Sequence, residues 1–503
     1  MAQSAPSPGL AREAIGLREV LFQSITHMAP AAAVAFSIIV GANFAAGALP
    51  LSVLFALVGC LLVAVSIGQL AKQLPSAGGF YTYAARGLHP AVGFLVGWGY
   101  AFVEPLVAPL LFLIFGNVVA STLQAELGWS YDTWWVVAAV GAAVVVFLFG
   151  WFGIRLSTGA GTILGLFEIL VFAALAVTLI VQAGDANTPS VFGTGFATVE
   201  GFGGLSGVIA GSVYTILAFI GFEAAAPLAE EAKDPRRTVR LAVVYSCLLI
   251  GLFYVLTTYA ATVFFGPGKF AEFPASGDGN PWDALARTAW GAGWVLVFLA
   301  VANSAIANAN ASANAATRTW FAMGRIRLLP RVLEHVNPRW RSPDVAVAVQ
   351  FAVGVVVSVW LGLQYKPLTA FALVGTIVTA VIIAIYMVVN LACLVFYLRE
   401  RRPEFNPLLH GLVPLLGIAA FVPALLTAVG IKAFNFISSL PYPISLVGPV
   451  VGVWFTLGVI FLIVLATRSP DRLRATAKVF GDEPATRAGT ATPRLTQPTE
   501  RGP

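Results

Sequence analysis

Residues 205–244 read LSGVIAGSVYTILAFIGFEAAAPLAEEAKDPRRTVRLAVV, and this stretch decides the fold of the chain. It predicts an apolar helix that carries a carboxylate, Glu223, at mid-membrane depth, directly after Ile220-Gly221-Phe222. A carboxylate at the centre of a spanning helix costs roughly 2.5–3.5 kcal/mol on insertion scales, so it normally faces a cavity, a partner or a pathway. A helix interrupted at mid-depth is typical of secondary transporters, in which the freed backbone groups hold substrate or ion. The stretch therefore predicts a solute carrier.

Composition places the rest of the chain in the membrane as well. Only 10% of the 503 residues are charged and 58% are hydrophobic, whereas a soluble protein is about 25% charged. Apolar runs of about 20 residues, each long enough to cross a bilayer, recur from Glu19 to Arg468. We therefore expect one all-α membrane domain with twelve transmembrane helices, at about 20–48, 50–72, 90–122, 133–153, 158–182, 204–229, 239–264, 290–322, 343–363, 368–398, 407–430 and 443–467.

Two tails flank this transporter domain, which we place at 18–467. The N-terminal tail, 1–17, is polar and shows no cleavable signal peptide. The C-terminal tail, 468–503, is rich in Thr, Pro, Ala, Gly and Arg and is expected to be disordered.

The distribution of Lys and Arg predicts the orientation in the cell membrane. If the N-terminus is inside, twelve spans leave both termini in the cytoplasm and place nearly all basic residues there. The outer side then holds only Lys269, Arg287, Lys366 and Lys432. The basic pI of about 9.3 is thereby explained by membrane topology, and no nucleic-acid partner is expected.

Two spans carry helix-breaking residues in corresponding places. The first span has His27-Met28-Ala29-Pro30 near its middle, where Pro30 removes one backbone hydrogen bond. The sixth has Phe219-Ile220-Gly221-Phe222. These spans are five apart and antiparallel, which predicts inverted five-helix repeats at about 20–182 and 204–398, with helices 11 and 12 at 407–467 outside them. For the first span alone, an ordinary proline kink is the alternative.

Three carboxylates, Glu104, Glu168 and Glu223, fall near the centres of their spans. No Lys or Arg lies at the same depth to neutralise them, so each is expected to be protonated, to titrate during transport or to be paired within a shared polar cavity. A neutral acid that merely hydrogen-bonds a neighbouring helix remains the alternative for each.

The eighth span, VFLAVANSAIANANASANAATRTWF, is rich in asparagine. At about 100° per residue, Asn303, Asn310 and Asn314 share one stripe, and Asn308 and Ser312 lie on another face. The stripe predicts either a polar wall that coordinates a cation or water, or hydrogen bonds that hold helices together. Both interpretations remain open.

Histidine and aromatic residues supply further candidates. His27, beside the first break, either relays protons near neutral pH or pins the unwound turn. Several aromatic residues are candidates to close over a solute, and Phe219 is the strongest because it lies at the break itself: Trp98, Tyr100, Tyr214, Phe219, Tyr254 and Tyr386. The three cysteines lack motif spacing, so neither a metal nor another cofactor is expected.

Four features together resemble the amino acid–polyamine–organocation superfamily of amino acid permeases. The first is PSAGGFYTY at 75–83 followed by 93–98. The second is the Gly-Phe-Glu, Glu-Glu and Asp-Pro-Arg-Arg series within 219–237. The third is 318–330 with the following NPRWRSPDVAV, and the fourth is the twelve-span layout. The resemblance covers about 18–467 and implies the inverted-repeat fold shared with the leucine transporter.

The resemblance also implies site residues. In the family, unwound backbone of the first and sixth spans holds the ammonium and carboxylate groups of the substrate. Glu223 matches a glutamate linked to proton-dependent gating in some members, and Glu168 falls where some proton-coupled members carry lysine. The implied substrate contacts are Ala29, Ala31, Ala32 and Ala33 opposite Phe219, Ile220 and Gly221.

Two departures from the family pattern limit what the resemblance implies. Many relatives have a glycine-rich turn where this chain has alanines at 31–33, which makes an α-amino acid substrate less secure. Glu168 in place of lysine leaves the coupling ion open. Glu104 adds negative charge and favours cationic or amine-bearing solutes.

The expected function is therefore import of an amino acid or related amine by alternating access, driven by protons. The coupling candidates are Glu223, Glu168, His27, Asn310 and Asn314, and Glu104 is assigned to the substrate. Sodium-coupled symport and exchange remain open. A membrane-embedded enzyme is disfavoured, because the acids lie at mid-depth and the loops are short. Oligomeric state stays open as well.

Overall fold

A computed structural model describes residues 15–75, 79–153, 158–230, 232–325, 329–340 and 342–468. The expectations for most of the N-terminal tail and for the C-terminal tail beyond Arg468 lie outside these ranges, as does part of the loop at 76–78.

The regular structure of these ranges is helical, and twelve helices are long and apolar enough to cross a membrane. The expected number of spans is thereby confirmed. The main helices are α1 (Leu17–Met28), α2 (Pro30–Ala32), α3 (Ala42–Ala45), α4 (Leu49–Gln73), α5 (Gly79–Gly87), α6 (Pro90–Leu127), α7 (Tyr131–Phe152), α8 (Thr158–Ala183), α9 (Leu205–Phe219), α10 (Pro235–Phe265), α11 (Ser276–Gly279), α12 (Pro281–Trp290), α13 (Trp294–Arg325), α14 (Asp344–Tyr365), α15 (Pro367–Arg399), α16 (Val413–Val429) and α17 (Val447–Arg468).

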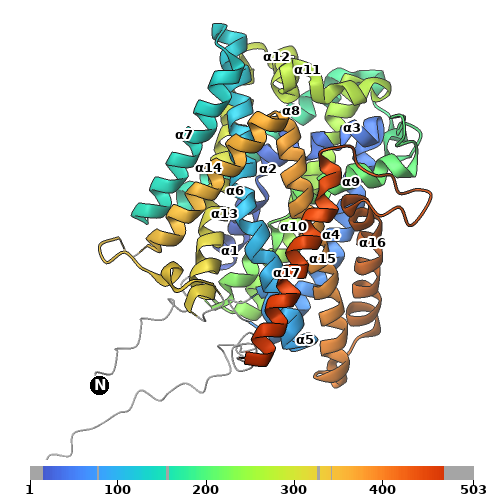
Figure 1. The fold of residues 1–503 in the computed structure, drawn as a ribbon. Coiled ribbons are helices and arrows are strands. Elements are labelled where there is room, and N and C mark those ends of the chain that lie inside the picture. Colours follow the sequence, from blue (N-terminus) through green and yellow to red (C-terminus); the bar gives the residue numbers. More distant parts are fainter. Residues whose placement is uncertain are drawn as a thin grey trace, which may run out of the picture.

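The long helices run beside one another, with α11 and α12 at one end of the bundle and α5 at the other (Figure 1). α6 packs against α7, α13, α14 and α15, and α4 packs against α10. The first span is shorter than expected, because a π-helical stretch ends it at Ile38 and the short α3 leads separately into α4.

The two interrupted spans lie in the interior of the bundle. Within the apolar windows of the first and sixth spans, 78% and 89% of the residues are buried, against 11% for the last span, Ile444–Arg468. The last span therefore lies at the outside of the bundle, whereas the interrupted spans face other helices on nearly all sides. Freed backbone groups in a membrane are tolerated only in such protected positions.

Two prolines inside α6 leave carbonyl groups that other helices satisfy. Proline lacks an N–H, so Pro105 and Pro109 each free the carbonyl four residues earlier. Trp320 Nε1 donates to the Ala101 carbonyl at 3.2 Å. Gln350 Nε2 donates to the Pro105 carbonyl at 3.0 Å. The carbonyls freed by the prolines thus bond α6 to α13 and α14, close to Glu104.

Candidate functional site

The break in the first span occurs at Ala29. α1 ends at Met28, Ala29 adopts the left-handed conformation (φ 47°, ψ 66°), and α2 starts at Pro30. A left-handed alanine is uncommon and costs roughly 1–2 kcal/mol, so the surrounding structure must hold it. Pro30 permits the interruption, because proline is tolerated in the first turn of a helix and cannot continue the preceding one.

The break in the sixth span follows Phe219, the last residue of α9. Ile220 is extended (ψ 125°) and Gly221 has a φ of 121°, after which a 3₁₀ stretch, Phe222–Glu230, continues the span. A Cβ atom at Gly221 would lie 2.7 Å from the carbonyl carbon of His27. Only glycine combines this φ with so close an approach. The two breaks are therefore in direct contact.

One tyrosine joins the two breaks. The Tyr254 hydroxyl of α10 lies 2.9 Å from the Met28 carbonyl oxygen and 3.0 Å from the Ala218 carbonyl oxygen. Both carbonyls lie where the helices are interrupted, and they share the single hydroxyl proton. The Tyr254 ring also meets the edge of Phe219 at a centroid distance of 5.3 Å. Tyr254 thereby holds both interrupted helices on a third one.

Two of the three mid-depth glutamates cap backbone amides at the breaks. Glu168 Oε2, from α8, accepts a hydrogen bond from the Ala31 N–H at 3.3 Å. Glu223 Oε2 accepts from the Gly221 N–H at 3.0 Å and from the Tyr386 hydroxyl at 2.9 Å. Each interrupted helix is thus closed by one buried carboxylate.

The third glutamate, Glu104 of α6, faces His27. Its Oε1 lies 3.5 Å from His27 Nε2, and both side chains are buried, at 3% and 6% exposure. The Tyr100 hydroxyl, one helical turn earlier, lies beside the same carboxylate. Within the described ranges, neither Lys nor Arg forms an ion pair with any of the three glutamates. His27 is the single basic group paired with them there.

The backbone expected to contact substrate is shielded from solvent. The alanines at 29 and 31–33 and Phe219 are at most 4% exposed, and Ile220 is partly exposed. Trp282 of α12 donates through Nε1 to the Val34 carbonyl at 3.1 Å and closes the π-helical stretch from one end. Most of this backbone is therefore shielded from solvent in this conformation.

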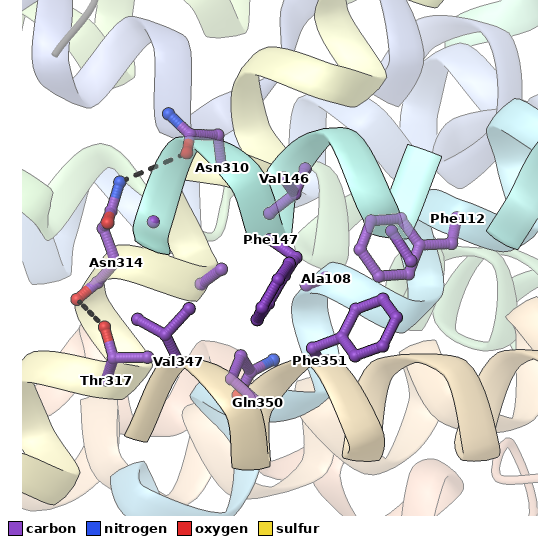
Figure 2. Close-up of a pocket in the computed structure, with 13 residues that line it drawn as sticks. Ala108, Phe112, Val146, Phe147, Asn310, Asn314, Thr317, Val347, Gln350 and Phe351 are labelled. Atoms are coloured by element: carbon purple, nitrogen blue, oxygen red, sulfur yellow. Dashed lines mark hydrogen bonds between the residues drawn. The ribbon is translucent and has the colours of Figure 1, made fainter. Parts of the chain in front are cut away.

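Asn310 and Asn314 lie in a different place from the glutamates. They line a narrow cavity between α6, α7, α13 and α14, opposite Phe112 and Phe351 (Figure 2). Asn314 Nδ2 donates to Asn310 Oδ1 at 3.3 Å. The three glutamates are not among the described residues that line this cavity. On the other polar face of α13, Ser312 donates to Asn308 at 2.9 Å.

Some residues of the site escape sequence reasoning. Tyr254 and Tyr386 look like aromatic residues suited to cover a solute. The Tyr254 hydroxyl instead donates to the carbonyls at the breaks, and the Tyr386 hydroxyl donates to the Glu223 carboxylate. Ser304 of α13, buried beside Glu168, has no distinguishing signal in an asparagine-rich span. In the described part of the chain, no three His, Cys, Asp or Glu side chains gather to hold a metal ion.

Twelve spans, two of them interrupted at mid-depth and packed break against break, are typical of secondary transporters. Comparison with known proteins agrees with that class. The amino acid permease family model matches residues 19–468, and the chain belongs to that family. It is therefore a multi-pass membrane transporter of the permease type and not an enzyme.

The family includes relatives named for different substrates. The chain is 24% identical over 396 residues to the low-affinity putrescine importer PlaP of Escherichia coli K12, covering 78% of this chain and 82% of the importer. It is 23% identical over 381 residues to the branched-chain amino acid permease BcaP of Bacillus subtilis, covering 72% and 76%. It is 26% identical over 388 residues to mouse cationic amino acid transporter 4, covering 74% and 57%.

Proposed function

We propose that this permease imports an amino acid or related amine by alternating access, coupled to protons, with its termini in the cytoplasm. The fold would consist of two inverted five-helix repeats, and the substrate would bind between the two breaks. Sodium-coupled symport and exchange are the competing modes within the same fold.

The observation that carries this proposal is the contact between the two breaks. The Gly221 backbone approaches His27, and Tyr254 bridges the Met28 and Ala218 carbonyls. Freed amides and carbonyls are what a zwitterion or an ammonium group needs, because they supply donors and acceptors without a charged side chain.

Internal groups already occupy these donors and acceptors. The Tyr254 hydroxyl takes the place that a substrate ammonium would take at the two carbonyls. Glu168 takes the place that a substrate carboxylate would take at the Ala31 amide. Substrate would therefore bind by exchanging one set of hydrogen bonds for another, which allows strong selectivity with modest net affinity.

A proton could control each break through its carboxylate. An ionised Glu223 accepts from both the Gly221 amide and the Tyr386 hydroxyl, and charge-assisted hydrogen bonds are about twice as strong as neutral ones. Protonation would weaken this cap and loosen the sixth span. Glu168 would act in the same way on the Ala31 amide, and His27 paired with Glu104 provides a third exchangeable site.

The surplus of negative groups favours an amine-bearing solute. Glu104, Glu168 and Glu223 are buried, and His27 is the basic partner recorded for them among the described residues. The relatives named for putrescine and for cationic amino acids agree with this preference. Because one relative is named for branched-chain amino acids, neutral amino acids are also tested as substrates.

Uptake into proteoliposomes tests the proposal. The purified protein is offered radiolabelled leucine, lysine, γ-aminobutyrate and putrescine under an imposed pH or Na⁺ gradient. Accumulation of one solute that a protonophore abolishes supports proton-coupled import. Accumulation that follows Na⁺ instead, or uptake only into vesicles preloaded with solute, replaces proton coupling by the corresponding competing mode.

A further inference from the structure

A basic pocket lies at one end of the bundle, away from the two breaks. It forms where the C-terminal end of α4, the first turns of α10 and the connection after α15 meet. Its lining residues are Lys72, Gln73, Asp234, Arg236, Arg237, Arg240, Arg401 and Glu404. Orientation by the positive-inside rule places this end at the cytoplasmic headgroup level.

One of the two acidic residues that line this pocket, Glu404, is already engaged. Glu404 lies 3.9 Å from Lys72 Nζ, accepts from Gln73 Nε2 at 2.8 Å, and accepts from Arg401 at 3.3 Å. These contacts join α4 to the connection after α15. Glu404 therefore has little capacity left to compensate the arginines of α10.

Three arginines in the first two turns of α10 form no ion pair with a described residue, including Asp234, the other carboxylate that lines the pocket. Among the described residues, Arg236, Arg237 and Arg240 have no recorded ion pair or side-chain hydrogen bond. Arg240 follows Arg237 by three residues and Arg236 by four, so it lies beside both of them on the helix surface. The Arg240 stem crosses α4 at Gly68, where a Cβ atom would lie 2.9 Å from Arg240 Cγ. Arg240 thus packs against α4, and it lines the same pocket as Lys72.

We propose that this pocket binds the phosphate group of an anionic ligand, either an inner-leaflet phospholipid headgroup or free phosphate. Guanidinium groups match phosphate oxygens in geometry and charge, and they bind them bidentately. The N-terminus of α10 adds partial positive charge at the same point. Basic pockets between spanning helices on the cytoplasmic side are suited to phospholipid headgroups.

The bound phosphate acts as a clamp on α10. It bridges α10 to α4 and to the Arg401 connection across the pocket that these three elements line. α10 follows the sixth span directly and carries Tyr254, which holds both breaks. The pocket thus lies on the same helix as the central tyrosine, although it does not depend on the transported solute.

The test measures binding of phosphatidylglycerol and of inorganic phosphate to the full-length protein. Native mass spectrometry in detergent compares phosphatidylglycerol with phosphatidylcholine, and inorganic phosphate is added as competitor. The Arg236→Gln/Arg237→Gln variant removes two of the free arginines. The matched control, Arg339→Gln/Arg468→Gln, removes the same charge from exposed positions outside the pocket.

The wild type is expected to bind phosphatidylglycerol in preference to phosphatidylcholine, and the pocket variant to lose roughly tenfold to thirtyfold in affinity while the control stays near wild type. Displacement by millimolar phosphate assigns the site to the phosphate group in general, and resistance to it assigns the site to the lipid headgroup. Equal losses in both variants overturn the proposal, and so does a wild type that shows neither a preference for phosphatidylglycerol nor binding of inorganic phosphate. Thermal unfolding of each variant in phosphatidylcholine verifies folding.

Discussion

The two interrupted spans differ in how the backbone break is formed and in which residue bonds the amide it frees. In the sixth span, the break uses Gly221, which needs no strain to reach a φ of 121°, and Glu223, two residues later, caps its amide. In the first span, Ala29 adopts a left-handed conformation, and the cap comes from Glu168, 137 residues away. The sixth break is built from local sequence, whereas the first depends on its neighbours. Loss of tertiary support should therefore disturb the first break before the sixth.

The largest effect is expected from Gly221→Ala. The added Cβ meets the His27 backbone, and alanine resists the required φ, so we expect a loss of roughly 2–4 kcal/mol in unfolding free energy and no measurable transport. Gly141→Ala is the control, because a Cβ there meets nothing within 4 Å. Chemical unfolding and uptake are measured for both. A Gly221→Ala protein with normal uptake would contradict the contact between the breaks.

Glu223→Gln should impair coupling more than folding. Glutamine keeps an acceptor for the Gly221 amide and the Tyr386 hydroxyl but does not titrate. We expect pH-driven accumulation to fall at least about tenfold, on the scale of typical proton-transfer contributions. The unfolding temperature should change little. Glu200→Gln, at an exposed position, is the matched control. Wild-type accumulation in the Glu223 variant would remove this residue from the mechanism.

Tyr254→Phe tests whether one hydroxyl joins both breaks. Removing it leaves the Met28 and Ala218 carbonyls buried without this donor, at a cost of about 1–3 kcal/mol. We expect a lower unfolding temperature and a severalfold loss of uptake. Tyr245→Phe serves for comparison, since Tyr245 is on the same helix and is 47% exposed. Equal behaviour of the two variants would show that the bridge contributes nothing.

Ala29→Gly should have the smallest effect. It tests directly whether the first break is strained where the sixth is not. Glycine removes about 1–2 kcal/mol of left-handed strain from the folded state. It also loses more backbone freedom on folding than alanine does, which destabilises the folded state by roughly 0.5–1 kcal/mol. The net change in unfolding free energy is expected to lie between about zero and about 1.5 kcal/mol of stabilisation. Ala32→Gly, at a helical position (φ −66°), should be clearly destabilising. If Ala29→Gly is the more destabilising of the two, the strain assigned to Ala29 is wrong.

Much of the fold could be predicted from the chain because hydrophobicity and breakers are local signals. Apolar runs determine which segments cross the membrane, and the twelve expected spans are confirmed. Pro30 and Gly221 mark both interruptions directly. The boundary after the first span was harder to predict, although Gly41, Asn43 and Gly47 lie between the π-helical stretch ending at Ile38 and α4. Glycine is also frequent inside membrane helices, so these residues alone do not mark where the span ends.

The expected site is only partly assembled from what the sequence displays. Three mid-depth glutamates stand out because charge is rare in spans, and two of them cap the breaks. Asn310 and Asn314 stand out for the same reason, yet they line a separate cavity. The sequence shows which polar residues share one side of a helix. It does not show which other helix packs against that side.

The sequence by itself determined the membrane class, the number of spans, the positions of the two breaks and the carboxylates near them. These depend on composition and on residues adjacent in the chain. The tertiary structure alone decided that Glu168 caps Ala31, that Tyr254 joins Met28 to Ala218, and that Trp320 and Gln350 satisfy the carbonyls freed by the prolines of α6. The physical reason is that a hydrogen bond between distant helices depends on their relative rotation and depth, which only the packing of the whole bundle sets.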